Sequence, residues 1–446
     1  MWGGRFSEPP DAILWNYKVD PADRRLLVDD LHGSLAHVTM LASVGLITAE
    51  ESHELHNGLR RLLADAADGT FEFVDTDEDV HTAVERRLHE VIGPVAGKLH
   101  TGRSRNDQMV LDLRLYLRRA GAERVAQLEG FVRLLADLAE RHADTVISSY
   151  THLQQAQPVP LGHHLLAYAF MAFRDRDRFL DALDRINVSP LGAGAGGGSS
   201  LPLDPARSAA ELDLAAVFEN SLDAVASRDF VAEYAFCCAQ AMVHLSRLAE
   251  EIILWSTIEF DWVTFADRYT TGSSALPHKK NPDIAEHARG RTAAVIGDLT
   301  TLMALQKGLP LAYNSDLQDD KPPLFRADDT LAGTLTALAG MLAGADFHPP
   351  PPSSWTTSLD LAESLVRRGV PFRQAHEAVG KLVVRLLGAG RTLAEATDAD
   401  LAGTHPLLEP ADLMGPTESI RRRSTWGGGS PSSVHRQVAE IRRRLG

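Results

Sequence analysis

The segment 271–283 carries the densest set of groups that could stabilise a negative charge and move a proton. It contains Ser273, Lys279 and the run Asn281-Pro282-Asp283, which is typical of a helix start with Asn281 as the N-cap and Pro282 at the first helical position. Free backbone N–H groups and the helix dipole favour an anion at such a start. A lone lysine pair would indicate a solvated turn, but this combination predicts a site for a carboxylate whose charge grows during a reaction.

A second segment, 97–108, is rich in hydrogen-bond donors. Ser104, Arg105 and Asn106 lie close to two glycines that allow close backbone approach, and an arginine fork matches the geometry of a carboxylate. Asn106 or Asp107 is predicted to cap the helix that follows. The alternative interpretation is an ordinary charged loop before a helix.

Two further segments could complete a site. Thr151 places a hydroxyl beside the imidazole of His152, the side chain best suited to proton transfer near neutral pH. Tyr313, Gln318 and Lys321 could orient a substrate. Taken alone, a histidine is more often structural, and the segment 311–322 reads as a polar surface loop.

Gly192, Gly194 and Gly197 match the G-x-G-x-x-G pattern of dinucleotide sites. That pattern requires a preceding strand and a following helix within a βαβ unit. Here the segment follows a predicted helix, and Pro202 comes soon after it. A loop without a nucleotide is therefore the favoured interpretation.

The composition limits the class of protein. In 446 residues, 44% are hydrophobic and only 6% aromatic, which favours helices rich in leucine and alanine. The formal charge of −15 argues against nucleic acid or an anionic membrane as the main partner. The neighbours Cys237 and Cys238 offer no disulfide framework, and no apolar run is long enough to span a membrane. We therefore expect a soluble, cytoplasmic protein.

Apolar residues at helical spacing indicate the elements that must position these groups. They predict an αα-hairpin over 23–68, with a capping box formed by Thr48 and Glu51. Long helices are predicted at 107–142, 162–186, 226–259, 282–307 and 327–342, and shorter ones at 358–368 and 373–387. Four consecutive prolines after His348 mark a boundary, because they cannot be helical.

Together these segments resemble the argininosuccinate lyase family, within the fumarase/aspartase superfamily. The matching motifs are Trp2-Gly3-Gly4-Arg5-Phe6, Glu78-Asp79-Val80-His81, Gly102–Gln108, Thr151-His152-Leu153-Gln154, Asn220–Ala224, the loop 273–282 and the segment 313–321.

The resemblance implies an all-α fold with three domains, at 1–102, 103–351 and 352–446, in which the middle one is a central bundle of long helices. It implies a homotetramer in which each active site combines segments of three subunits. The implied activity is that of a carbon–nitrogen lyase in arginine biosynthesis. Such an enzyme eliminates fumarate from argininosuccinate and leaves arginine, with no metal or organic cofactor.

The resemblance also implies roles for single residues. Lys279 and Asn281 match groups that stabilise the developing charge, and Glu286 matches the carboxylate that orients His152. Ser273 and His152 match the acid and the base, which this family assigns in either order. The matching substrate-orienting groups are Asn106, Thr151, Tyr313, Gln318 and Lys321, with Ser104 and Arg105 beside them.

Two alternatives remain at this point. A paralogous lyase could eliminate fumarate from another N-substituted aspartate, because Val19 stands where many members have a substrate-binding serine. A non-catalytic helical assembly protein could keep the fold. The presence of Ser273, His152, Lys279 and Glu286 together counts against that second alternative.

Overall fold

The computed structural model describes residues 11–446, which form two compact units. The first unit comprises residues up to 125 with 177–240 and 293–331, and the second comprises 126–176, 241–292 and 332–446. The motif Trp2–Phe6 lies outside the described residues. The division into three domains stays a prediction.

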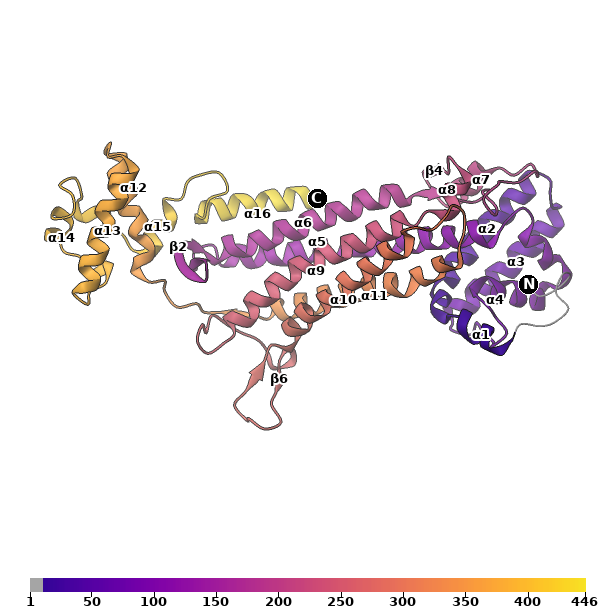
Figure 1. Ribbon diagram of the computed structural model, residues 1–446, viewed down its shortest axis with the longest axis horizontal. Coiled ribbons are helices and arrows are strands. Elements are labelled where there is room, and N and C mark those ends of the chain that lie inside the picture. Colours follow the sequence, from indigo (N-terminus) through magenta and orange to yellow (C-terminus); the bar gives the residue numbers. More distant parts are fainter. Residues whose placement is uncertain (1–10) are drawn as a thin grey trace. The chain divides into compact units, whose positions relative to one another are not determined.

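The predicted all-α class is confirmed, and the long helices are continuous ribbons (Figure 1). Within residues 11–446, no helix has the length and apolar character needed to cross a membrane. The helices are α1 (Ala12–Lys18), α2 (Leu27–Ser43), α3 (Ala49–Ala67), α4 (Val80–Ile92), α5 (Arg105–Arg141), α6 (Leu161–Ile186), α7 (Pro205–Glu211), α8 (Ser221–Ala226), α9 (Asp229–Trp255), α10 (Asp283–Gln306), α11 (Lys321–Ala343), α12 (Ser358–Arg367), α13 (Phe372–Gly388), α14 (Asp398–Ala402), α15 (Pro416–Arg421) and α16 (Pro431–Leu445).

Short strands pair in twos and connect these helices. Three pairs are antiparallel: β1 (Val146–Thr151) with β2 (Gln154–Pro160), β5 (Val263–Thr264) with β8 (Asp346–Phe347), and β6 (Thr271–Gly272) with β7 (Lys280–Asn281). The pair β3 (Val188–Ser189) and β4 (Ala216–Val217) is parallel. The composition did not indicate these strands, because most of them are too short to show an alternating pattern.

Local signals predicted some helix ends correctly and others not. The capping box of Thr48 and Glu51 is confirmed. The predicted helix 226–259 is wrong at both ends, because α8 ends at Ala226, α9 begins at Asp229, and α9 stops at Trp255. Arg228 lies in the break between α8 and α9. Its side chain is buried, and its guanidinium donates to the carbonyl oxygen of Ser227.

In the first unit, a buried carboxylate ties three helices together. The hydroxyl of Tyr116 on α5 donates to Asp328 on α11 over 3.1 Å, and the hydroxyl of Tyr234 on α9 donates to the other oxygen over 2.7 Å. Burial raises the pKa of Tyr116, and the nearby charge of Asp328 raises it further, so the phenol remains a donor. Phe325 lies edge-on to the ring of Tyr116, and Phe179 lies edge-on to the ring of Tyr234.

The second unit contains polar links of the same kind between its own segments. His244 on α9 contacts Asp175 on α6 over 2.7 Å, and Thr292 on α10 donates to the carbonyl oxygen of Met242 over 3.2 Å. Towards the C-terminus, α12 and α13 bury a separate apolar cluster that includes Leu365 and Leu382. The hairpins β1–β2 and β6–β7 belong to this same unit.

We predict that Asp320→Ala strongly destabilises the first unit. Asp320 is fully buried, accepts from Arg228 Nε over 2.6 Å and contacts Lys321 Nζ over 3.2 Å. Its removal leaves two buried cations without a counterion, which should lower the free energy of unfolding by about 3–5 kcal/mol. Urea denaturation at fixed protein concentration measures this change.

The matched control is Glu377→Ala, which removes an exposed i,i+4 partner of Lys381. The unfolding midpoint of this control should not move, because solvent screens such pairs. Equal midpoints for the two variants would contradict the assignment of Asp320 as a buried anchor.

Candidate active site

The donor-rich segment of the first unit is anchored at the first turn of α5. The backbone N–H of Ser104 donates to Asp107 Oδ1 over 2.9 Å, and Ser104 Oγ accepts from the N–H of Asn106 over 3.2 Å. Ser104 is therefore the cap, and the prediction that Asn106 or Asp107 caps this helix is wrong. Asp107 lies at the third helical position, from which its carboxylate reaches back to Ser104.

The glycine-rich loop wraps around the same carboxylate. Asp107 Oδ2 accepts from the N–H groups of Gly192 over 3.2 Å and Gly194 over 2.9 Å. Gly194 has φ +59° and would carry a side chain against the carbonyl oxygen of Gly198, so glycine is required there. Here the pattern that resembles a dinucleotide fingerprint supplies donors to a protein carboxylate.

A cleft of about 980 Å³ in the first unit borders this segment. Arg105 lies in it, 3.4 Å from Glu85 Oε2 and 3.7 Å from Asp79 Oδ2. Burial and the charge of Arg103 lower the pKa of His100, another wall residue, to about 4, which keeps this imidazole neutral at neutral pH. The cleft is lined by Trp15, Thr76, Glu78, Thr82, Glu85, Arg86, His89, His100, Gly102, Arg103, Ser104, Arg105, Gly194, Ala195, Gly198 and Ser199.

The remaining predicted groups of the first unit differ in accessibility. Burial raises the pKa of Tyr313 to about 12, so its phenol is a donor near neutral pH. Gln318 is half-buried. Lys321 is buried, and its ammonium donates to the carbonyl oxygen of Gln318 over 3.1 Å as well as contacting Asp320. Lys321 is therefore already engaged within the protein.

The hairpin β1–β2 in the second unit presents Thr151 and His152. Thr151 pairs with Gln154, so His152 and Leu153 form a two-residue turn, and their φ angles are +53° and +56°. Positive φ at both positions matches the right-handed twist of a hairpin but is unfavourable for residues other than glycine, asparagine and aspartate. The imidazole of His152 is exposed at the tip of a strained turn, a conformation found often at functional sites.

The hairpin β6–β7 holds the loop predicted to bind an anion. Ser273 Oγ accepts from the backbone N–H groups of Ala275 over 3.2 Å and Leu276 over 3.0 Å. Lys279 is exposed, and Asn281 lies on β7. The prediction that Asn281 is the N-cap is wrong by one residue, because the carbonyl of Pro282 accepts the first helical bonds, from Ala285 and Glu286.

Glu286 is exposed on the first turn of α10. Among the hydrogen bonds and ion pairs of residues 11–446, none joins His152 to Ser273 or to Glu286. Within one chain, the structure thus groups Ser104, Arg105 and Asn106 at the start of α5. It leaves His152 exposed on the hairpin β1–β2, half-buried Ser273 and exposed Lys279 on the loop of β6–β7, and exposed Glu286 on the first turn of α10.

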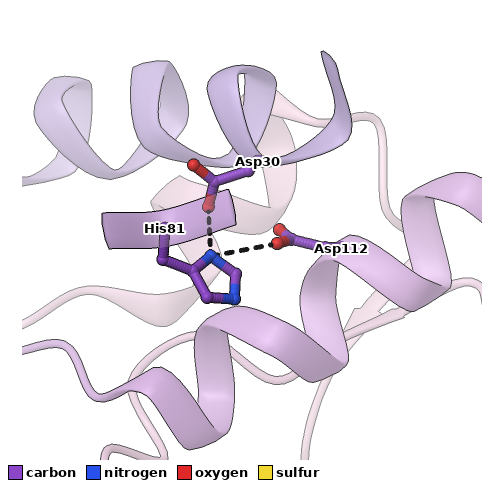
Figure 2. Close-up of side chains that lie close together, drawn as sticks. All are labelled: Asp30, His81 and Asp112. Carbon is purple, nitrogen blue, oxygen red and sulfur yellow. Dashed lines mark hydrogen bonds and ion pairs between the residues drawn. The ribbon is translucent and has the colours of Figure 1, made fainter. Parts of the chain in front are cut away.

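Sequence reasoning assigned no role to a buried polar cluster that Figure 2 shows. His81 on α4 lies 2.9 Å from Asp30 on α2 and 3.5 Å from Asp112 on α5. The sequence signal for this cluster was the motif Glu78-Asp79-Val80-His81, which matched the family but did not by itself indicate a chemical role. Asp30 and Asp112 stand in ordinary helical sequence, so only the fold could bring them to His81.

Comparisons with known proteins agree with this architecture. A family model described as Lyase matches residues 4–297, and one described as Argininosuccinate lyase C-terminal matches residues 355–421. The argininosuccinate lyase of Frankia casuarinae is 48% identical over 99% of this chain and 97% of its own length. That of Geobacillus thermodenitrificans is 43% identical over 100% and 99%. The crystal structure of EDDS lyase in complex with formate has a TM-score of 0.83 and 30% identity over 98% of this chain and 93% of that chain.

We predict that Asp107→Ala destabilises the protein by about 3 kcal/mol or more, because three backbone N–H groups lose their acceptor in a buried place. Denaturant unfolding checks this. Asp204→Ala is the matched control, since its exposed carboxylate caps a short helix by accepting the N–H of Arg207, and it should cost about 1 kcal/mol. Similar costs would mean that the glycine loop does not depend on Asp107.

Proposed function

The chain belongs to the argininosuccinate lyase family, and on that premise we propose that it cleaves argininosuccinate to arginine and fumarate by acid–base elimination. The observation that carries this proposal is the 43–48% identity to argininosuccinate lyases along essentially the whole chain. Identity to EDDS lyase is 30%, so a paralogous lyase for another N-substituted aspartate is not favoured.

The central demand of such a reaction is electrostatic. Removing a proton from the carbon beside a carboxylate gives that carboxylate a second negative charge, and donors already in place lower the barrier. We assign this role to Lys279 and Asn281, together with the N–H groups in the first turn of α10. The ammonium of Lys279 supports the assignment because it is exposed at the hairpin, a few residues before that turn.

We assign to Ser273 the removal of the carbon-bound proton from the substrate. Two backbone N–H groups already point at its oxygen, and hydrogen bonds to the deprotonated form favour that form. His152 then protonates the departing guanidine nitrogen, and Glu286 orients the imidazole. The donors around Ser273 support this assignment of base and acid. The imidazole of His152 is exposed and is a side chain suited to proton transfer near neutral pH.

The groups of the first unit bind the substrate in this proposal. Ser104 and Arg105 line the cleft at the fixed start of α5, where a carboxylate can accept from them, and Asn106 follows them on the first turn. Tyr313 adds a phenolic donor. The remaining orienting groups are Thr151, Gln318 and Lys321.

We further propose a homotetramer with shared active sites. Ile296 and Met303 lie two helical turns apart on α10 and are 45% and 61% exposed, and Leu153 beside His152 is 78% exposed. Large apolar side chains gathered on a helix face are typical of a surface that other subunits cover. We place the protein in the cytoplasm, where the thiols of Cys237 and Cys238 stay reduced.

We predict that the purified protein releases fumarate from argininosuccinate without added metal, seen as rising ultraviolet absorbance. Adenylosuccinate and EDDS, offered in parallel at equal concentration, should give little or no product. Absence of product from argininosuccinate, at enzyme concentrations where a known argininosuccinate lyase is active, would defeat the proposal. Faster release from either competitor would favour the paralogous lyase.

We predict that Ser273→Ala and His152→Asn each abolish turnover and leave the size of the assembly unchanged. If the two residues serve one site from different subunits, dissociating and reassociating an equal mixture should restore about a quarter of wild-type activity, because one site in four then receives both intact residues. Size-exclusion chromatography and the fumarate assay report the two quantities. No recovery from the reassembled mixture would place both residues in one chain.

A further inference from the structure

The polar cluster of Asp30, His81 and Asp112 is enclosed by three helices of the first unit. The exposed fractions of the three side chains are 0%, 1% and 0%. One nitrogen or oxygen atom from each lies within 4.8 Å of the other two. Figure 2 shows the imidazole of His81 between the two carboxyl groups. No part of the proposed chemistry uses these residues.

The two carboxyl groups have unequal surroundings. Asp30 Oδ1 accepts from His81 Nδ1 over 2.9 Å and from Gln108 Nε2 over 2.5 Å. For Asp112, neither oxygen has a hydrogen-bond donor among the described residues, although both atoms are buried. A buried ionised carboxylate without donors is strongly disfavoured, so the ionised form does not account for the position of Asp112.

The charges around Asp112 also disfavour its ionised form. The charged groups acting on Asp112 are Asp29 and Asp30 on α2 and the guanidinium of Arg103, which is buried beside Ser34. The guanidinium of Arg103 can balance one of the two buried carboxyl groups, and the Nδ1 hydrogen of His81 is given to Asp30. A second ionised carboxyl group would repel Asp30 in a medium of low dielectric constant.

We propose that Asp112 is a neutral carboxylic acid that donates its proton to Asp30, and that this shared proton holds α5 against α2 and α4. Burial, followed by the charge of Asp30, raises the pKa of Asp112 well above its usual value. Asp30 then remains the only ionised group of the pair and accepts from His81, Gln108 and Asp112.

This cluster lies directly behind the substrate-binding segment. Gln108 follows Asp107 on the first turn of α5, and Arg103 precedes Ser104. A change in the charge of Asp30 therefore acts on Ser104, Arg105 and Asn106 through one turn of helix. Resting on the proposed function, the inference makes Asp30 and Asp112 positioning residues for substrate binding.

A divalent cation among the three side chains is the rival explanation. The amide N–H of Gln108 already points at Asp30, and the guanidinium of Arg103 lies nearby. Both would repel a metal ion, and complete burial leaves it no water ligands. A proton meets the same need for positive charge with none of these conflicts.

The test compares two amide substitutions of similar shape. Asp112→Asn retains a neutral side chain that donates to Asp30. KM and kcat should therefore stay within about twofold of wild type, and the urea midpoint should not move. Asp30→Asn removes the ion that balances Arg103, and it should raise KM for argininosuccinate by about tenfold with a smaller change in kcat. Loss of folded protein alone would lower kcat and leave KM unchanged. Equal damage from both variants, or an Asp30→Asn effect confined to kcat, overturns the proposal.

A direct measurement does not depend on turnover or on the folding of Asp30→Asn. The infrared difference spectrum between wild type and Asp112→Asn at neutral pH should show the carbonyl band of a protonated carboxyl group, whereas exposed Asp398→Asn should not lose it. Absence of the band, or one tightly bound metal ion per chain by elemental analysis, overturns the proposal. If wild type releases no fumarate, the function fails, and the band still decides the state of Asp112.

Discussion

The structure depends on buried carboxylates that collect donors from other elements of the first unit. Asp107 accepts from the backbone N–H groups of its N-cap residue Ser104 and of the glycine loop, Asp328 accepts from two phenols, and Asp320 pairs with Arg228 and Lys321. Each of these carboxylates would be costly to bury alone, so the elements that supply the donors must stay in contact with it. Apolar packing provides the general stability of the helices. The carboxylates determine which residues meet, because hydrogen bonds are directional and leucine contacts are not.

This constraint acts differently on the two classes of functional residue. The N–H of Ser104 is held by Asp107 and the N–H of Asn106 by Ser104 Oγ before any ligand binds, so this turn of backbone is preorganised. The loop of Ser273 is instead held by the short pair β6–β7, by local hydrogen bonds such as those to its serine, and by the exposed ion pair of Lys280 with Asp267. A reaction that generates charge and then releases two products is served by both properties, since a fixed binding surface orients the substrate and a lightly held loop can open.

Much of the helical architecture could be predicted from the sequence, because heptad-like spacing of leucine and alanine extends over many turns. The start of α5 at Arg105 instead of 107 follows from a local signal that was assigned to the wrong residue, because Ser104 is the cap and Asp107 reaches back to it. The break between α8 and α9 could not be predicted, since it depends on the tertiary contact of Arg228 with Asp320. The hairpin β1–β2 was missed because its turn of His152 and Leu153 has no glycine or asparagine to indicate it, and β6–β7 was missed because its strands are too short to show a pattern. The cluster around His81 required partners from three helices, and no local pattern encodes such a meeting.

The positive φ angles of His152 and Leu153 connect the strained turn with the assembly. A turn with two unfavourable residues persists only if its surroundings hold it, yet within the chain both side chains are exposed. If the proposed neighbouring subunits cover Leu153, the same contact would offset the strain, bury the apolar side chain and aim the imidazole into a site that no single chain completes. The exposure of His152 and Glu286 in one chain is then the expected state of residues whose surroundings come from other copies.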